Sequence, residues 1–233
     1  MNFRLPLRAL AIGAAMVSAA GLVAGPAVAK EEPAAATKPA PLSSKIDTDP
    51  NHDPENVLVL DLSTGGRVLI RLKPDWAPKH VERIKTLASQ GFYDGLIFHR
   101  VIDGFMAQTG DPTGTGQGGS QLPDLEAEFN SIPHVRGIVS MARTNDPNSA
   151  NSQFFIVFYP RFSLDYKYTA FGRVIAGMQY VDAIHRGEPP QDPSKIVQAS
   201  LYSQHKPVPA TPVGGSANDA PVTLDDLNNS QSN

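Results

Sequence analysis

The chain has 233 residues, of which 41% are hydrophobic, 18% are charged and none is cysteine. This length suffices for one or two domains, and the lack of cysteine excludes disulfides, thiol nucleophiles and zinc sites built on cysteine. The formal net charge of −3 argues against a nucleic-acid partner, because nucleic-acid-binding proteins usually carry a basic footprint.

The first 29 residues have the composition of a secretory signal peptide. Two arginines precede the apolar run 9–23, and the small residues Ala-Val-Ala follow at 27–29. The run is shorter than the ~20 apolar residues that span a bilayer, which favours cleavage over a membrane anchor. We therefore expect a signal peptide over 1–29 and a mature chain that starts at Lys30. We expect this mature chain to have no membrane span and to be secreted, into the periplasm if the source is bacterial.

Two flanking segments are rich in proline and poor in large apolar side chains. They cover residues 30–54 and 206–233. Neither can bury enough surface to offset the entropy of ordering. We expect a disordered Pro/Ala-rich linker over 30–54, a disordered tail over 206–233, and one domain over 55–205 between them.

The pattern within this domain predicts eight strands and two helices. The first helix opens at Asp75 and Pro78, carries an apolar stripe at helical spacing and ends before Gly91, and the second covers 178–185. Runs rich in β-branched and aromatic residues predict strands at 56–62, 67–72, 96–102, 105–109, 137–142, 153–158, 169–174 and 196–203. Many strands with only two helices, at opposite ends, favour a closed β-structure over alternating βαβ units.

Several standard site motifs are absent from the sequence. The six histidines occur singly, without an H-x-x-x-H pair, and no G-x-S-x-G motif is present. Residues 114–119 have the spacing G-x-G-x-x-G, but the following Ser-Gln-Leu-Pro is a poor helix start. We interpret this run as a flexible loop rather than a nucleotide site.

The segment 98–108 carries the most distinctive chemistry. Arg100 is a lone cation among apolar neighbours in a predicted strand. Strand alternation after the turn at 103–104 places Met106 and Gln108 on one face and Phe105 on the other, unless a bulge redirects them. Periodicity alone leaves a second interpretation open, in which Arg100 simply extends from a sheet edge into water.

Five motifs, in order and at matching spacing, resemble the cyclophilin family of peptidyl-prolyl cis–trans isomerases. They are GFYDG at 91–95, FHRVIDGFMAQTGD at 98–111, GTGQGG at 114–119, SMARTNDPNSANSQFFI at 140–156 and LDYKYTAFGRV at 164–174. The likeness runs from about Val57 to Ser203, and together with the signal peptide it indicates a bacterial secreted or periplasmic member. It implies a mainly β fold, a closed eight-stranded antiparallel β-barrel capped by two α-helices. It also implies an enzyme that isomerises X–Pro bonds and assists protein folding in the cell envelope.

The resemblance also implies roles for individual residues. Arg100 and Gln108 correspond to catalytic positions. The substrate-binding positions are Phe105, Met106, Ala142, Arg143, Gln153, Phe155, Leu164 and Tyr168. No metal, nucleotide or redox cofactor is implied. The expected partners are proline-containing unfolded or extended polypeptide segments, and we expect a monomer.

Three positions depart from the family pattern. Tyr168 stands where many eukaryotic members have His, Arg143 replaces an Asn in a loop one residue longer, and Ser163 stands where many members have Trp. Cyclosporin packs near that Trp in cyclophilins, and Phe162 restores the lost contact area only if it turns inward. We therefore expect an active isomerase that cyclosporin inhibits only weakly.

Two other function classes remain open from the residues. One is a cyclophilin-like module or chaperone that holds proline segments without isomerising them, and the other is a structural envelope protein. The retention of Arg100 with Phe105, Gln108 and Phe155 favours the enzyme. The Pro-rich flanks lack the repeats that a structural role would suggest.

Overall fold

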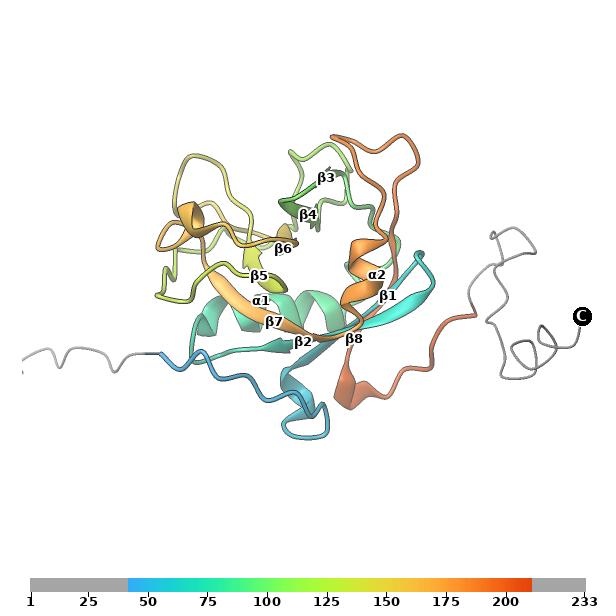
Figure 1. Cartoon of the computed structure of the whole chain (residues 1–233), viewed down its shortest axis with the longest axis horizontal. Helices are drawn as coiled ribbons and strands as arrows, with labels where there is room; N and C mark the ends of the chain where they lie inside the picture. The colour runs from blue at the N-terminus through green and yellow to red at the C-terminus, as the bar shows by residue number, and fades with distance from the viewer. Residues whose placement is uncertain (1–41, 211–233) are drawn as a thin grey trace, which may run out of the picture. The chain divides into compact units, whose positions relative to one another are not determined.

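An antiparallel sheet of eight strands, with two helices packed against it, forms the described part of this computed structural model, residues 42–210 (Figure 1). The predicted signal peptide, the first part of the predicted linker and residues 211–233 lie outside the described residues. The strands are β1 Val57–Leu62, β2 Gly66–Leu72, β3 Arg100–Ile102, β4 Met106–Thr109, β5 Ile138–Met141, β6 Phe154–Val157, β7 Ala170–Ala176 and β8 Ile196–Leu201. The helices are α1 Pro78–Ser89 and α2 Met178–Asp182. All eight predicted strands and both predicted helices are confirmed, although α2 is shorter than predicted.

The strand order is β3-β4-β6-β5-β7-β2-β1-β8, with every pair antiparallel. The sheet curls, with β3 and β4 above β2 and β7 in Figure 1. A continuous ladder between the edge strands β3 and β8, as a closed barrel requires, is not observed. An isolated bridge, Ile97 with Lys195, joins the chain just before β3 to the chain just before β8. Backbone hydrogen bonds join the same segments: Ile196 O accepts from Gly95 N at 2.7 Å, Leu96 O accepts from Ile196 N at 2.9 Å, and Ser194 O accepts from Phe98 N at 2.8 Å. Regular pairing of the predicted strand 96–102 starts only at Arg100, so these contacts, and not a continuous ladder between β3 and β8, join the two ends of the sheet.

The apolar side chains form two clusters on opposite faces of the sheet. The larger cluster takes side chains from all eight strands and both helices. The smaller cluster includes Met106, Ile138 and Val157 from β4, β5 and β6. Strand β6 contributes to both, because Phe154 points into the larger cluster and its neighbour Phe155 into the smaller one. A site on the face of β4–β6 that carries the smaller cluster is therefore backed by the larger cluster on the opposite face.

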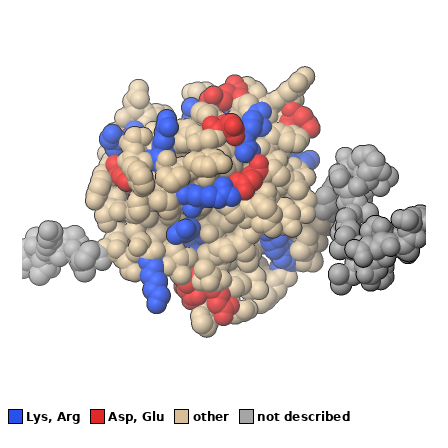
Figure 2. Space-filling view, viewed as in Figure 1, with Lys and Arg blue, Asp and Glu red and all other residues tan. Residues whose placement is uncertain are grey.

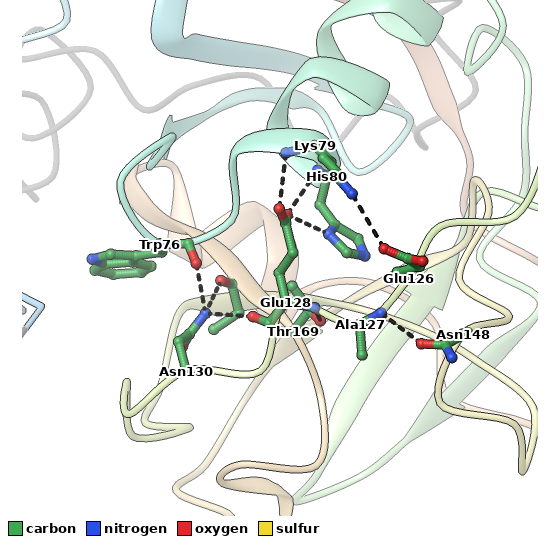
Figure 3. Close-up of polar contacts among 10 residues, drawn as sticks. Trp76, Lys79, His80, Glu126, Ala127, Glu128, Asn130, Asn148 and Thr169 are labelled. Atoms are coloured by element: carbon green, nitrogen blue, oxygen red, sulfur yellow. Dashed lines mark hydrogen bonds and ion pairs between the residues drawn. The ribbon is translucent and has the colours of Figure 1, made fainter. Parts of the chain in front are cut away.

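The start of α1 is capped by a side chain from a distant loop. Glu128 accepts hydrogen bonds from the backbone N–H groups of Lys79 and His80, at 3.3 and 3.2 Å, and from His80 Nδ1 at 2.7 Å (Figure 3). The first turn of α1 has no acidic residue of its own, so this carboxylate satisfies free N–H groups and faces the positive end of the helix dipole. Beside it, Asn130 Nδ2 donates to the carbonyl oxygens of Trp76 and Ala170. These bonds tie the 126–130 loop to α1 and to β7.

The N-terminal segment 42–54 lies against the domain, which differs from the prediction of a disordered linker over 30–54. Its anchor is Arg71 on β2, which is only 4% exposed. The Arg71 guanidinium donates to the carbonyl oxygens of Asp47, Asp49 and Asp53 at 3.1, 2.6 and 3.0 Å. The segment was predicted to be disordered because it has few large apolar side chains. It is held through its backbone by a cation that is distant in sequence, and its few apolar side chains, Leu42 and Ile46, pack against the smaller cluster.

Substituting Arg71 is expected to release this segment. Arg71→Ala removes three charge-assisted hydrogen bonds, so we expect the free energy of unfolding to fall by at least about 1.5–3 kcal/mol, the contribution of one such bond. The only tryptophan of the chain, Trp76, donates Nε1 to Ser43 O at 3.0 Å and reports on the segment. Its fluorescence emission should shift to longer wavelength in Arg71→Ala. Arg173→Ala, at the position paired with Arg71 across β2 and β7, is the control and should leave the emission unchanged.

The structure describes only the first part of the predicted disordered tail over 206–233. Residues 206–210 are described, and Lys206 contacts the sheet, since its carbonyl oxygen accepts a hydrogen bond from Arg67 Nη2 at 3.1 Å. Among residues 42–210, no helix is long and apolar enough to cross a membrane. On the face shown in Figure 2, basic and acidic side chains are interspersed.

Candidate active site

Strand register gathers the central residues of the site on one face. Arg100 of β3 pairs with Gln108 of β4, and Gln108 pairs with Phe155 of β6. Paired residues in neighbouring strands point to the same face, so the three side chains form a row across β3, β4 and β6. Met106, two residues before Gln108, belongs to the same face, as predicted.

Phe105 was predicted on the opposite face, and that prediction is wrong. The structure places Phe105 beside Met106 in one cavity. Phe105 precedes β4 and follows the turn at Gly104, where φ is +66°, so strand alternation does not apply to it.

A cavity of about 690 Å³ lies over this face. Nine of the ten predicted site residues line it: Arg100, Phe105, Met106, Gln108, Ala142, Arg143, Phe155, Leu164 and Tyr168. The tenth, Gln153, lines an adjoining cavity of about 610 Å³. Gln153 Oε1 accepts from Gln108 Nε2 at 2.8 Å, while its Nε2 donates to the carbonyl oxygens of Gly116 and Gly118 at 3.1 and 2.7 Å. Gln153 thus holds Gln108 and the neighbouring loop in place.

Aromatic side chains form the floor and one wall of the cavity. Phe155 is 4% exposed, and its ring packs edge-on against Tyr168, with ring centres 5.7 Å apart. The Arg143 guanidinium lies 4.6 Å from the Tyr168 ring centre, and that of Arg161 lies 5.1 Å from the Phe105 ring centre. The result is an apolar slot with cations at its rim. Such a slot suits a small apolar ring attached to a polar backbone.

A buried hydrogen-bonded chain lies against Phe155, whose ring stacks on that of His134 with ring centres 6.4 Å apart. His134 Nδ1 bonds to Asp165 Oδ1 at 2.8 Å, and His134 Nε2 lies 2.9 Å from Ser140 Oγ. Burial lowers the pKa of His134 despite its bond to Asp165, which favours the neutral imidazole. The order Asp–His–Ser is that of a hydrolase triad, but Ser140 is fully buried and does not line the cavity. These residues therefore act as a structural support.

Besides residues 114–117 of the glycine-rich loop, four residues of the cavity had no predicted role. They are His99, Arg161, Glu188 and Pro189. His99 is 5% exposed, and burial lowers its pKa, which favours a neutral ring beside Arg100. Arg100 itself has a 44% exposed side chain and donates Nε to Glu188 Oε2 at 2.7 Å. The sequence did not indicate a role for Glu188 in the site, because Glu188 lies 88 residues from Arg100 in a loop without a recognisable motif.

The glycine-rich run 114–119 is a loop beside the cavity, as predicted, and an acidic residue holds it. Asp111 accepts hydrogen bonds from the backbone N–H groups of Thr113, Thr115 and Gly116 at 2.7, 3.1 and 2.6 Å. A Cβ at Gly118 would lie 2.1 Å from Asp111 Oδ1, so only glycine fits there. Burial raises the pKa of Asp111, but the hydrogen bonds from Thr113, Gly118 and Gly116 outweigh it and lower the pKa to about 2.

This lowered pKa predicts a pH dependence of stability. The contribution of ionised Asp111 to the free energy of unfolding is complete above the unfolded-state pKa and is lost as the pH falls from about 4 to about 2. A shift of this size is worth about 2 kcal/mol at neutral pH. Asp111→Asn should therefore lower the free energy of unfolding by about that amount at pH 7 and flatten its slope below pH ~4. Asp103→Asn, at an 84% exposed carboxylate, is the control for denaturant titrations at several pH values.

Comparison with known proteins agrees with this geometry. The family model "Cyclophilin type peptidyl-prolyl cis-trans isomerase/CLD" matches residues 59–201, more than half of the chain. A probable peptidyl-prolyl cis-trans isomerase of Brucella suis is 47% identical over 170 residues, which are 66% of this chain and 86% of that protein. The isomerase ppi1 of Schizosaccharomyces pombe is 43% identical over 143 residues, covering 58% of this chain and 92% of that protein.

Solved structures give the same result. Cyclophilin AquaCyp293 from Hirschia baltica is 32% identical with a TM-score of 0.61, and the match covers 66% of this chain and 77% of that one. A cyclophilin-type isomerase of Cryptosporidium parvum, crystallised in the presence of the dipeptide Ala-Pro, is 30% identical with a TM-score of 0.58. That match covers 62% of this chain and 98% of the other. The chain therefore belongs to the cyclophilin-type peptidyl-prolyl cis–trans isomerases.

Proposed function

We propose that this isomerase catalyses cis–trans isomerisation of X–Pro bonds in the cavity over β3, β4 and β6, with Arg100 as the catalytic cation. The observation that carries this proposal is the row Arg100–Gln108–Phe155, which places a guanidinium at the edge of an apolar slot. The C. parvum relative crystallised with Ala-Pro supports a proline-containing ligand for this fold.

The chemistry requires rotation about an amide bond without any covalent change. The planar X–Pro bond resists rotation with a barrier of roughly 18–20 kcal/mol because of its partial double-bond character. In the twisted transition state this resonance is lost and the prolyl nitrogen gains a usable lone pair. An enzyme accelerates the rotation by binding the twisted state better than either planar isomer.

The residues of the cavity suit that task. Phe105, Met106, Phe155 and Leu164 would hold the proline ring while the preceding residue rotates. Arg100, which is permanently charged, would donate to the prolyl nitrogen and to the proline carbonyl oxygen. The hydrogen bond of a charged donor contributes about 1.5–3 kcal/mol, so anchoring and partial desolvation in the slot must supply the rest of the acceleration.

A protease-coupled assay on a short X–Pro peptide tests the proposed site. Wild type at catalytic concentration should accelerate cleavage of the cis fraction, and a proline-free peptide should compete poorly for the cavity. The alternative, a module that binds proline segments without isomerising them, gives peptide binding with no acceleration.

We also propose that the protein acts outside the cytoplasm, on folding clients of the cell envelope. The composition of residues 1–29 supports this location, and the clients would present extended proline segments to a monomeric enzyme. We expect N-terminal sequencing of the protein purified from its natural source to start at Lys30. An intact Met1 on envelope material would contradict this location.

A further inference from the structure

Glu188 has no role in the proposed reaction, yet it is the direct partner of the catalytic cation. Arg100 Nε donates to Glu188 Oε2 at 2.7 Å, and both residues line the same cavity. Within residues 42–210, this is the only side-chain hydrogen bond of Arg100. A guanidinium carries five N–H donors, so a carboxylate on Nε leaves the four donors of the terminal amino groups free.

The loop that carries Glu188 is fixed to the strand that carries Arg100. Gly187 N donates to Val101 O at 2.8 Å, and Val101 N donates to Gly187 O at 2.7 Å. These reciprocal bonds pair Gly187 with Val101. Because Glu188 follows Gly187 and Arg100 precedes Val101, the pairing brings Glu188 close to Arg100. Gly187 has φ +145°, and a Cβ there would lie 2.5 Å from Pro190 Cα, so the loop needs glycine to adopt this path.

Two side chains that precede Glu188 in the sequence, those of Arg186 and His185, hold the loop further. The Arg186 guanidinium lies 4.2 Å from the Phe158 ring centre and pairs with Asp103 at 3.2 Å. His185 Nδ1 donates to Asp192 O at 2.6 Å. The carboxylate of Glu188 is therefore presented to Arg100 from an anchored loop.

We propose that Glu188 is a positioning residue: it holds Nε of Arg100 so that the terminal amino groups are in place before the substrate binds. The inference rests on the proposed function, because it concerns the cation that acts on the prolyl amide. Arg100 sits on a three-residue edge strand and its side chain is 44% exposed, so without a partner it would sample many rotamers. Fixing such a group in advance removes an ordering cost from the reaction.

The test measures kcat and KM of the full chain on one X–Pro peptide for four proteins. Glu188→Ala should lower kcat about tenfold with a smaller change in KM, because the loss of a charge-assisted hydrogen bond falls on the transition state. Glu188→Gln should retain at least about half of the activity, since its amide oxygen still accepts from Nε. Asp192→Ala removes an exposed carboxylate from the same loop without touching Arg100 and should match wild type.

A second readout separates positioning from a general structural role. The NMR signal of the Arg100 Nε–H group should be sharp and slow to exchange in wild type and Glu188→Gln, and broadened in Glu188→Ala. An active wild type with an equally active or faster Glu188→Ala variant would overturn the inference while the proposed function stands. An inactive wild type would overturn both.

Discussion

Replacing Arg100 with alanine is expected to lower kcat/KM by about 10- to 150-fold, the range that corresponds to one lost charge-assisted hydrogen bond. The fold should survive, because the Arg100 side chain is 44% exposed and lies on a short edge strand. Arg100→Lys should also have a low kcat/KM, since the point charge of lysine cannot reproduce the planar fork of donors of arginine.

A matched control exists on the same molecule. Arg136 is also 44% exposed, and it also pairs with a carboxylate, that of Asp182. Arg136 does not line the cavity, so Arg136→Ala should keep wild-type turnover. Thermal melting of both variants checks that each is folded. Full turnover by a folded Arg100→Ala protein would remove Arg100 from the mechanism.

Introducing tryptophan at Ser163 is expected to tighten cyclosporin binding at least tenfold, with a smaller change in turnover. Ser163 lines the cavity at the position where many family members have Trp. The neighbouring Phe162 does not replace it, because this residue is 62% exposed and does not line the cavity. An indole would add on the order of 60–80 Å² of contact, worth roughly 1.5–2 kcal/mol.

Inhibitor titration of wild type and Ser163→Trp measures this effect. Tyr159→Trp adds an indole at a 60% exposed position outside the cavity and should leave inhibition weak. Tight inhibition of wild type, or no gain in Ser163→Trp, would show that cyclosporin does not depend on this position here.

The part of the site that follows from strand pattern could be predicted. The alternation that places Met106 and Gln108 on one face depends only on local periodicity. The family motifs identified Phe155, Leu164 and Tyr168 as substrate-binding positions. Strand alternation gave the wrong face for Phe105, because a turn resets alternation, whereas the family motifs correctly placed Phe105 among the residues of the cavity. Glu188 was missed because its contact with Arg100 is tertiary and its own loop has no motif.

The edges of the domain were harder to predict for a similar reason. Composition indicates how much surface a segment can bury, and by that measure the segment 42–54 should be disordered. Its attachment depends on carbonyl oxygens, which every sequence supplies, and on Arg71, whose burial cannot be read from residue type. The packing of Leu42 and Ile46 against the smaller cluster adds to it. How the two ends of the sheet meet was likewise not predictable, because eight predicted strands do not reveal where regular pairing begins.

The central claim is that the cavity rotates the proline bond rather than only holding it. Two-dimensional NMR exchange spectroscopy on a short X–Pro peptide, with a catalytic amount of wild type, tests this directly. The account predicts exchange cross-peaks between the cis and trans forms that are strong with wild type and near background with Arg100→Ala. Peptide binding to wild type, seen as shifted signals, without accelerated exchange would contradict it.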